Sequence, residues 1–128
     1  MKIYYKRNCG SSKRALEWFR TYNIDIDMLN IRKITQDDLI QVLSLSDNGI
    51  FDIIKRSVNV TSANNKIREK INNMSFNEAV IYLSRNPNIL ITPIIIEKNR
   101  CLIGFNSDKI RQFFPKEYRK YLLERDKL

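Results

Sequence analysis

Histidine is absent from the 128-residue chain, and cysteine occurs only twice. The lack of histidine excludes histidine-based catalytic triads and metal sites built from histidine. Two cysteines are too few for the disulfide framework of a small secreted protein. No apolar run approaches the ~20 residues that a membrane-spanning helix needs. We therefore expect no disulfide scaffold, no membrane partner and no cofactor.

The remaining composition fits one globular domain. A chain of this length can bury roughly two-thirds of its unfolded surface, and its hydrophobic fraction of 43% is ordinary. The first residues, Met1–Tyr5, follow a strand pattern and not the long apolar stretch of a signal peptide, so we expect a cytoplasmic location. We also expect the protein to be a monomer. The net charge of +9 favours an acidic partner such as nucleic acid. A solvated basic surface explains the same charge equally well.

Cys9 lies where a strand pattern gives way to a helix pattern. After a polar turn, apolar residues recur at helical spacing, at Ala15, Trp18, Phe19 and Tyr22. At a helix N-terminus, unpaired N–H groups and the helix dipole stabilise a thiolate. Such placement brings a cysteine pKa from about 8.5 to roughly 3.5–7.5. Cys9 is therefore a candidate redox thiol, and the alternative is a small residue in a loop.

The first part of the chain is predicted to form a strand, a helix and a second strand. The strands are Lys2–Tyr5 and Ile24–Met28, and residues 11–22 have helical periodicity. Two strands joined by a helix imply a parallel pair with a right-handed crossover.

Helical patterns without strand signals follow, from residue 31 to residue 87. Thr35 is a predicted helix cap and Ser75 begins a capping box, while Gly49 suits a positive φ between helices. A short, mostly buried helix is expected over Ile50–Ile54. The apolar face after Ser75 is predicted to consist of Phe76, Ala79, Val80 and Leu83.

The chain then returns to strands, at Ile94–Ile96 and Cys101–Phe105, which form a predicted antiparallel hairpin. A final helix, capped by Asn106 or Ser107, is expected to carry Ile110, Phe113 and Phe114. This order predicts an α/β protein with a thioredoxin-like four-stranded mixed sheet, βαβ…ββα, and an inserted helical subdomain. The expected core is 1–30 and 88–115, the insert is 31–87, and 116–128 is a C-terminal tail that is either a docked helix or a partner-binding end; together they form the single domain 1–128.

In this arrangement Pro93 lies beside Cys9, because the loop before the hairpin faces the N-terminus of the first helix. A proline in this place is cis in thioredoxin-like folds. The alternative is an ordinary proline at the start of a strand.

Four segments carry a resemblance to a known family: Ile3–Leu16 around Cys9; Leu45–Gly49 with Asp52–Ile54; Pro93–Ile96; and Ile103–Pro115. The last two are the most specific. Together these segments resemble the arsenate-reductase-like (ArsC) family, and within it the Spx branch. The resemblance extends along nearly the whole chain.

The resemblance implies a transcriptional regulator, active in stress responses, that binds the C-terminal domain of the RNA polymerase α subunit. Gly49 and the loop Lys6, Arg7 and Asn8 match the family's polymerase-binding side. Promoter DNA is then an expected partner only within the polymerase complex. A Clp-type protease and its adaptor stay open as partners, because Asp126-Lys127-Leu128 does not clearly match the family's apolar end.

The departures from the family concern the thiol. Where many Spx proteins carry a Cys-x-x-Cys switch, the fourth position here is Ser12, so no disulfide can form there. Cys101 begins the return strand, roughly 10 Å or more from Cys9 on the rise of a strand, which is too far for a disulfide. We therefore expect a structural Ser12, a small buried Cys101 and no redox-active disulfide.

An enzymatic alternative is single-thiol arsenate reduction, or a glutaredoxin-like oxidoreductase. Cys9-Gly10-Ser11-Ser12 resembles the loop of the family's enzymes. Those enzymes have arginines where this chain has Thr92 and Phe105, and a histidine where it has Tyr5. Threonine and phenylalanine cannot hold an oxyanion in two-pronged fashion as arginine does. We therefore expect no enzyme here.

A basic stretch in the insert is the candidate surface near DNA. Its residues are Lys66, Arg68 and Lys70. A regulator bound between polymerase and promoter gains from cations near the phosphates. The alternative is a solvated helix surface.

Overall fold

The computed structural model describes residues 1–56, 65–118 and 120. The elements in chain order are β1 (Lys2–Tyr5), α1 (Gly10–Thr21), β2 (Asp27–Asn30), the 3₁₀ helix η1 (Ile31–Lys33), α2 (Gln36–Ser44), η2 (Gly49–Asp52), α4 (Asn65–Asn72), α5 (Phe76–Arg85), η4 (Pro87–Ile89), β3 (Ile94–Glu97), β4 (Arg100–Ile103) and η5 (Lys109–Phe113). No helix in this described part is long and apolar enough to cross a membrane.

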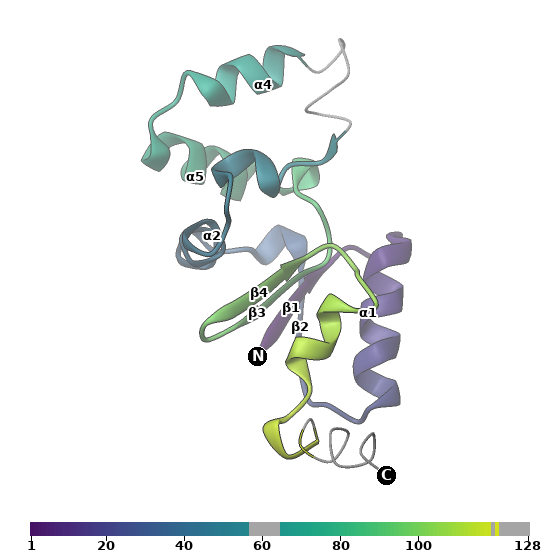
Figure 1. Cartoon of the computed structure of the whole chain (residues 1–128). Coiled ribbons are helices and arrows are strands. Elements are labelled where there is room, and N and C mark those ends of the chain that lie inside the picture. Colours follow the sequence, from purple (N-terminus) through teal and green to yellow (C-terminus); the bar gives the residue numbers. More distant parts are fainter. Residues whose placement is uncertain (57–64, 119, 121–128) are drawn as a thin grey trace.

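The four strands form one mixed sheet in the order β2-β1-β3-β4. β1 runs parallel to β2 and antiparallel to β3, and β3 pairs antiparallel with β4. This confirms the predicted α/β fold with its thioredoxin-like mixed sheet. Figure 1 shows α1 and η5 beside one face of the sheet, and α2, α4 and α5 extending away beyond the other.

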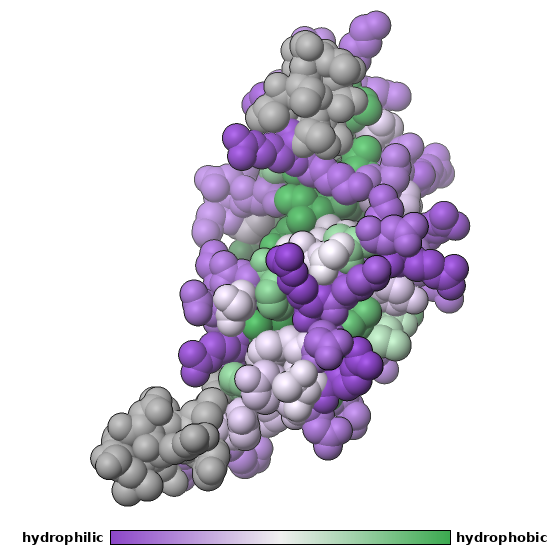
Figure 2. Space-filling view, turned by 90° about the vertical axis from the view of Figure 1, so that its right-hand side faces the viewer, coloured by the Kyte–Doolittle hydropathy of each residue, from purple (hydrophilic) through white to green (hydrophobic). Residues whose placement is uncertain are grey.

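Alternation along the strands divides the core into two clusters. Tyr4, Ile94 and Ile96 pack with the helices between β2 and β3. Ile3 and Ile95 face the other way, toward α1 and η5. The period of two in side-chain direction therefore gives both faces of the sheet an apolar layer. On the face drawn in Figure 2, hydrophilic side chains surround a strip of hydrophobic surface.

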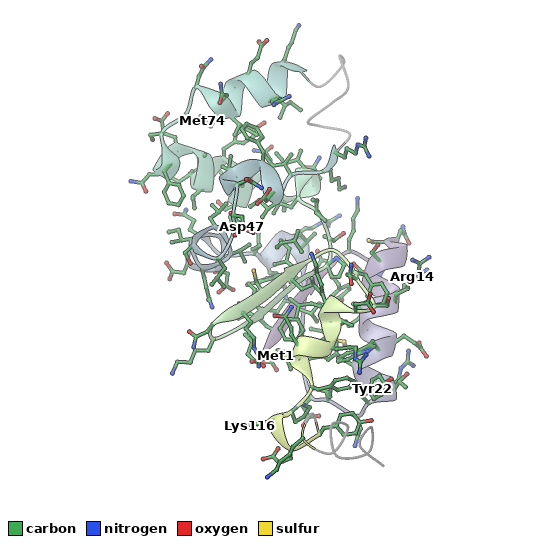
Figure 3. The ribbon with its side chains drawn as sticks, in the orientation of Figure 1. Met1, Arg14, Tyr22, Asp47, Met74 and Lys116 are labelled. Carbon is green, nitrogen blue, oxygen red and sulfur yellow. The ribbon has the colours of Figure 1, made fainter. Side chains whose placement is uncertain are left out.

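The C-terminal segment is held against α1 by aromatic rings. The ring of Phe114 lies 4.8 Å from the rings of Trp18, Tyr22 and Tyr118. Figure 3 shows Tyr22 at the end of α1, near the segment that leads to Lys116. Most of the predicted tail, residues 119 and 121–128, lies outside the described residues.

The predicted caps of α2 and α5 and the turn at Gly49 are confirmed. Thr35 caps α2 by accepting the Asp38 N–H, and Ser75 and Glu78 form the capping box of α5. Gly49 has a φ of 81°, a conformation that is costly for residues with a Cβ. The predicted cap of the last helix is wrong, because its N-cap is Asp108, while Asn106 accepts the backbone N–H groups of Asp108 and Lys109 in the turn before it, each at 2.9 Å.

The second strand begins at Asp27, and the prediction that it starts at Ile24 is wrong. Asn23 takes a φ of 53°, and the N–H of Ile24 bonds to the Phe19 carbonyl at 2.9 Å. These contacts tie Ile24 to the end of α1, while its side chain and that of Ile26 pack on the cluster beneath that helix. The alternating pattern therefore reflects packing of a connection as well as of a strand.

One buried position, one strand end and one helix type also differ from the prediction. Phe76 is 54% exposed, because it begins α5 outside the buried face of Ala79, Val80 and Leu83. The hairpin's return strand ends at Ile103, where Gly104 turns with a φ of 77°. The last helix is a short 3₁₀ segment that nevertheless buries Ile110 and Phe113 as predicted.

Candidate functional site

Cys9 is the N-cap residue of α1, as its place between strand and helix predicts. Its sulfur accepts the Ser12 N–H at 3.5 Å and the Thr92 hydroxyl at 3.2 Å. The Thr92–Pro93 peptide bond is cis. The structure therefore brings Cys9, Ser12 and the Thr92–Pro93 turn together, although they lie in separate halves of the chain.

The surroundings of Cys9 favour its thiolate. Partial burial raises its pKa, but the hydrogen bonds from Ser12, Thr92 and the N–H of Ser11 outweigh this effect and lower the pKa to about 7. Hydrogen bonds to the charged form stabilise it directly. Close to neutral pH, a substantial fraction of Cys9 is thus a nucleophilic thiolate.

Ser12 occupies the position where a second cysteine would complete a Cys-x-x-Cys pair. It is 1% exposed, and its hydroxyl accepts the Lys6 N–H at 3.1 Å. Ser12 thereby ties the loop after β1 to the first turn of α1. Its assignment as a structural residue of the site stays a prediction, which this placement favours.

Cys101 lies at the other end of the sheet. It pairs with Ile96, which in turn pairs with Lys2 at the start of β1, whereas Cys9 follows the end of β1. Both cysteines are free thiols. Burial raises the pKa of Cys101, and it packs against the cluster of the insert.

The residues expected to contact a partner lie on two segments. Lys6, Arg7 and Asn8 are exposed in the loop after β1. Gly49 begins η2, and a Cβ added to it would meet no atom within 4 Å. The Ser46 hydroxyl, which receives the Gly49 N–H at 3.1 Å, fixes this turn. Gly49 therefore presents bare backbone beside open space.

Sequence reasoning missed Lys55 and undervalued Thr92. Burial and the neighbouring Lys6 ammonium lower the pKa of Lys55, while the charge of Cys9 acts in the opposite direction. Lys55 therefore lies in the electrostatic field of the thiol. Only the fold places it there, because its N–H pairs with the carbonyl of Ile89 at 2.9 Å. The position of Thr92 directly before Pro93 was the available signal for a group touching the sulfur.

The candidate DNA-facing cations lie on α4, which Figure 1 shows well apart from α1. Lys66, Arg68 and Lys70 are exposed. The guanidinium of Arg68 lies 5.4 Å from the Phe51 ring centroid, and the Lys70 ammonium lies 5.1 Å from that of Tyr82. Two of the three cations thus also contact aromatic rings of the insert.

The positions that bear charge in the family's enzymes are uncharged in this site. Thr92 touches the sulfur with a hydroxyl, and Phe105 packs against the cluster beneath α1. Within the described residues, no three His, Cys, Asp or Glu side chains form a group suited to a metal. The chemistry available at Cys9 is that of a single, partly ionised thiol.

Comparison with known proteins agrees with this architecture. The model of the ArsC family matches residues 4–113. The global transcriptional regulator Spx of Streptococcus mutans is 32% identical over 120 residues, which cover 92% of this chain and 85% of that protein. Spx 1 of Lactococcus lactis is also 32% identical over 120 residues, covering 92% and 91% of the two chains.

Solved structures share the fold at lower identity. An ArsC family related protein from Bacteroides fragilis superposes with a TM-score of 0.72 at 19% identity, covering 87% of this chain and 94% of that one. A possible arsenate reductase from Streptococcus mutans gives a TM-score of 0.68 at 16% identity, covering 88% and 97%. The match along nearly the whole chain shows that this protein belongs to the ArsC family, in the branch of its Spx relatives.

Proposed function

We propose that this protein regulates transcription, in response to stress, by binding the C-terminal domain of the RNA polymerase α subunit. The regulator names of its relatives at 32% identity support the general role. The observation that favours a regulator over a reductase is the chemistry around Cys9. Two hydroxyl-bearing residues, Ser12 and Thr92, take the place of a second thiol and of an oxyanion-binding arginine.

Gly49 is the proposed centre of the partner contact, with Lys6, Arg7 and Asn8 as a second contact. Its positive φ and the open space beside it allow another protein to approach the backbone closely. A large side chain at position 49 would occupy the space that the partner needs. Within this protein, the same side chain has room, because no atom lies within 4 Å of an added Cβ.

The test is direct binding of the purified full chain to the purified α C-terminal domain, measured by calorimetry. We expect binding by the wild type and its loss in Gly49→Arg. Gly49→Ala is the matched control, because it carries the same strain of a positive φ without the bulk. Absence of wild-type binding at tens of micromolar, or equal affinities of the two variants, would contradict the proposal.

Lys66, Arg68 and Lys70 are the proposed contacts to promoter DNA within the polymerase complex. Each phosphate contact adds to the salt dependence of binding. Lys66→Gln leaves the ring contacts of Arg68 and Lys70 in place. This substitution should weaken the promoter complex while leaving binding to the isolated α domain unchanged. A Clp-type protease and its adaptor are proposed for turnover, and degradation assays with the full chain test them.

A second candidate is a thiol-dependent reductase, and the lowered pKa of Cys9 favours it. The similarity of fold to possible arsenate reductases leaves this role open. It predicts arsenate turnover that requires an added thiol reductant and disappears in Cys9→Ser. Turnover absent from the wild type would remove this candidate. If Cys9→Ser also leaves transcription unchanged under oxidant, the regulator acts without a redox step.

A further inference from the structure

A hollow of about 660 Å³ lies at the edge of the sheet where β1 and β2 end. Lys6 and Arg7 line it from the loop after β1, Arg32 from η1, and Arg85 from the last turn of α5. Three stretches distant in sequence therefore bring four cations to one recess. In open α/β sheets, the carboxyl ends of the strands are where ligands commonly bind.

The recess is positive without internal compensation. None of its lining residues is acidic, and the ion pairs formed within the described residues, Lys2–Asp38, Arg20–Glu17 and Arg100–Glu97, involve other cations. Among the smaller hollows of about 320–330 Å³, two pair one arginine with Glu69 or Glu17, and a third has Arg111 as its single cation. The large recess gathers more positive charge than any of these three.

Neutral donors accompany the cations. The amides of Asn8, Asn30 and Asn88 also line the recess. The amide oxygen of Asn30 already accepts the Arg32 N–H at 3.0 Å, which leaves its NH₂ group to donate. Guanidinium and amide groups together suit an oxygen-rich anion, because arginine binds phosphate through paired N–H groups.

The crowding of positive charge extends beyond the lining. The ammonium of Lys55 is close enough to Lys6 for its pKa to be lowered. Bringing like charges together is unfavourable, and an anion bound between these groups would relieve the repulsion. A monovalent carboxylate would offset only one of the four lining charges.

We propose that this recess binds the phosphate groups of a small, multiply phosphorylated molecule of the nucleoside di- or triphosphate class. Two or three linked phosphates match the number of cations, and the half-buried ring of Pro87 can contact a base or sugar. A volume of this size lies within the range of small-molecule sites, about 300–1,000 Å³. The recess shares Lys6, Arg7 and Asn8 with the proposed polymerase contact, but its test uses this chain alone, so the failure of one proposal does not decide the other.

The test is calorimetry on the full chain with pyrophosphate, ADP and adenosine at low salt, and with a short DNA duplex as a separate arm. We expect ADP and pyrophosphate to bind, adenosine not to bind, and the affinity to fall as salt is added. Arg32→Gln/Arg85→Gln should weaken ADP binding by about tenfold or more, as expected for lost hydrogen bonds between charged groups.

The matched control is Arg14→Gln/Arg111→Gln, which removes the same formal charge outside the recess and should bind ADP as the wild type does. Amide NMR on the wild type provides a measurement that needs no variant. Pyrophosphate should shift the amide signals of residues 6–8, 30–32, 84–86 and 88. Equal weakening in the two double variants, shifts confined to other residues, or binding of the duplex but of neither ADP nor pyrophosphate would overturn the proposal.

Discussion

The two ends of β1 hold titratable groups in very different settings. At its start, Lys2 pairs with Asp38 at 2.8 Å, the Tyr4 hydroxyl donates to the same carboxylate at 2.5 Å, and Cys101 lies across the hairpin. At its other end, Cys9 receives hydrogen bonds from Thr92 and Ser12 beside solvent. The first end faces the packed insert, and the second opens onto the recess lined by Lys6 and Arg7.

Both ends lower the pKa of an acid, by different means. Burial raises the pKa of Asp38, but Lys2 and Tyr4 outweigh it. At Cys9, neutral hydroxyl and N–H donors outweigh burial in the same way. One shift rests on a part-buried ion pair and a buried tyrosine hydroxyl, and it stabilises the fold. The other leaves a thiolate accessible, so the same direction of shift has different consequences.

The largest expected effect comes from breaking the buried end. Asp38→Ala leaves the buried Tyr4 hydroxyl without its acceptor and should lower the free energy of unfolding by about 2–3 kcal/mol. The exposed neighbour Asp37 is the control, because Asp37→Ala removes a charge from the same first turn of α2 and should cost within about 0.5 kcal/mol. Urea unfolding measures both.

The contribution of Asp38 also has a pH dependence of known sign. Since folding lowers its pKa below the ordinary 3.8, its stabilising effect is complete above that value and is lost as the pH falls through the folded pKa. The difference in the free energy of unfolding between the wild type and Asp38→Asn should therefore become smaller in acid. A difference that grew below pH 4, or a changed reactivity of Cys9 in these variants, would contradict the separation of the two ends.

The second prediction compares the cysteines themselves. At pH 7, Cys9 with a pKa of about 7 is roughly half ionised, whereas burial raises the pKa of Cys101 and keeps it in the thiol form. The lower intrinsic nucleophilicity of the more acidic thiol offsets part of this difference. We expect iodoacetamide to modify Cys9 roughly tenfold faster or more.

Mass spectrometry on the intact chain measures the two rates. The variants Cys9→Ser and Cys101→Ala show which rate belongs to which cysteine. Comparable rates in the folded protein would remove the distinction between the two ends. In urea the rates should converge, because the surroundings that separate the pKa values are lost.

The buried end was largely predictable and the exposed end only in part. The strand pattern of Lys2–Tyr5 and the apolar run Ile94–Ile96 predict the sheet, and Thr35 and Ser75 predict helix starts, because each signal is local in sequence. Cys9 is marked by the change from strand to helix pattern. The hydrogen bond from Thr92 needs the antiparallel pairing of β1 and β3, which joins residues far apart in the chain.

The recess shows the same limit. Lys6 and Arg7 belong to a segment that sequence reasoning singled out, whereas Arg32 and Arg85 carry no local signal. Arg32 reaches the recess because β2 begins at Asp27 and ends later than predicted. A shift of this kind moves the residues that follow the strand, so an error in one boundary hides a site that depends on tertiary structure.

The third prediction sharpens the account of the exposed end. Thr92→Val removes the hydroxyl that donates to the sulfur and should raise the pKa of Cys9 by about one unit, as expected for one hydrogen bond to a charged group. Thr92→Ser retains a hydroxyl and should restore most of the shift. The pH dependence of alkylation gives the midpoint, and an unchanged midpoint in Thr92→Val would assign the shift to α1 alone.

The smallest expected effect is on stability, and its sign is opposite at the two cysteines. Because folding lowers the pKa of Cys9 to about 7 from 9.0, its contribution appears as the pH rises through 7 and is complete above 9. Because folding raises the pKa of Cys101, its contribution turns unfavourable as the pH rises above the unfolded value. We therefore expect, from urea unfolding between pH 6 and 10, that the free energy of unfolding of the wild type rises with pH relative to that of Cys9→Ser. Relative to that of Cys101→Ala, it should fall. Parallel curves for all three proteins would show that the two ends of β1 do not differ in this way.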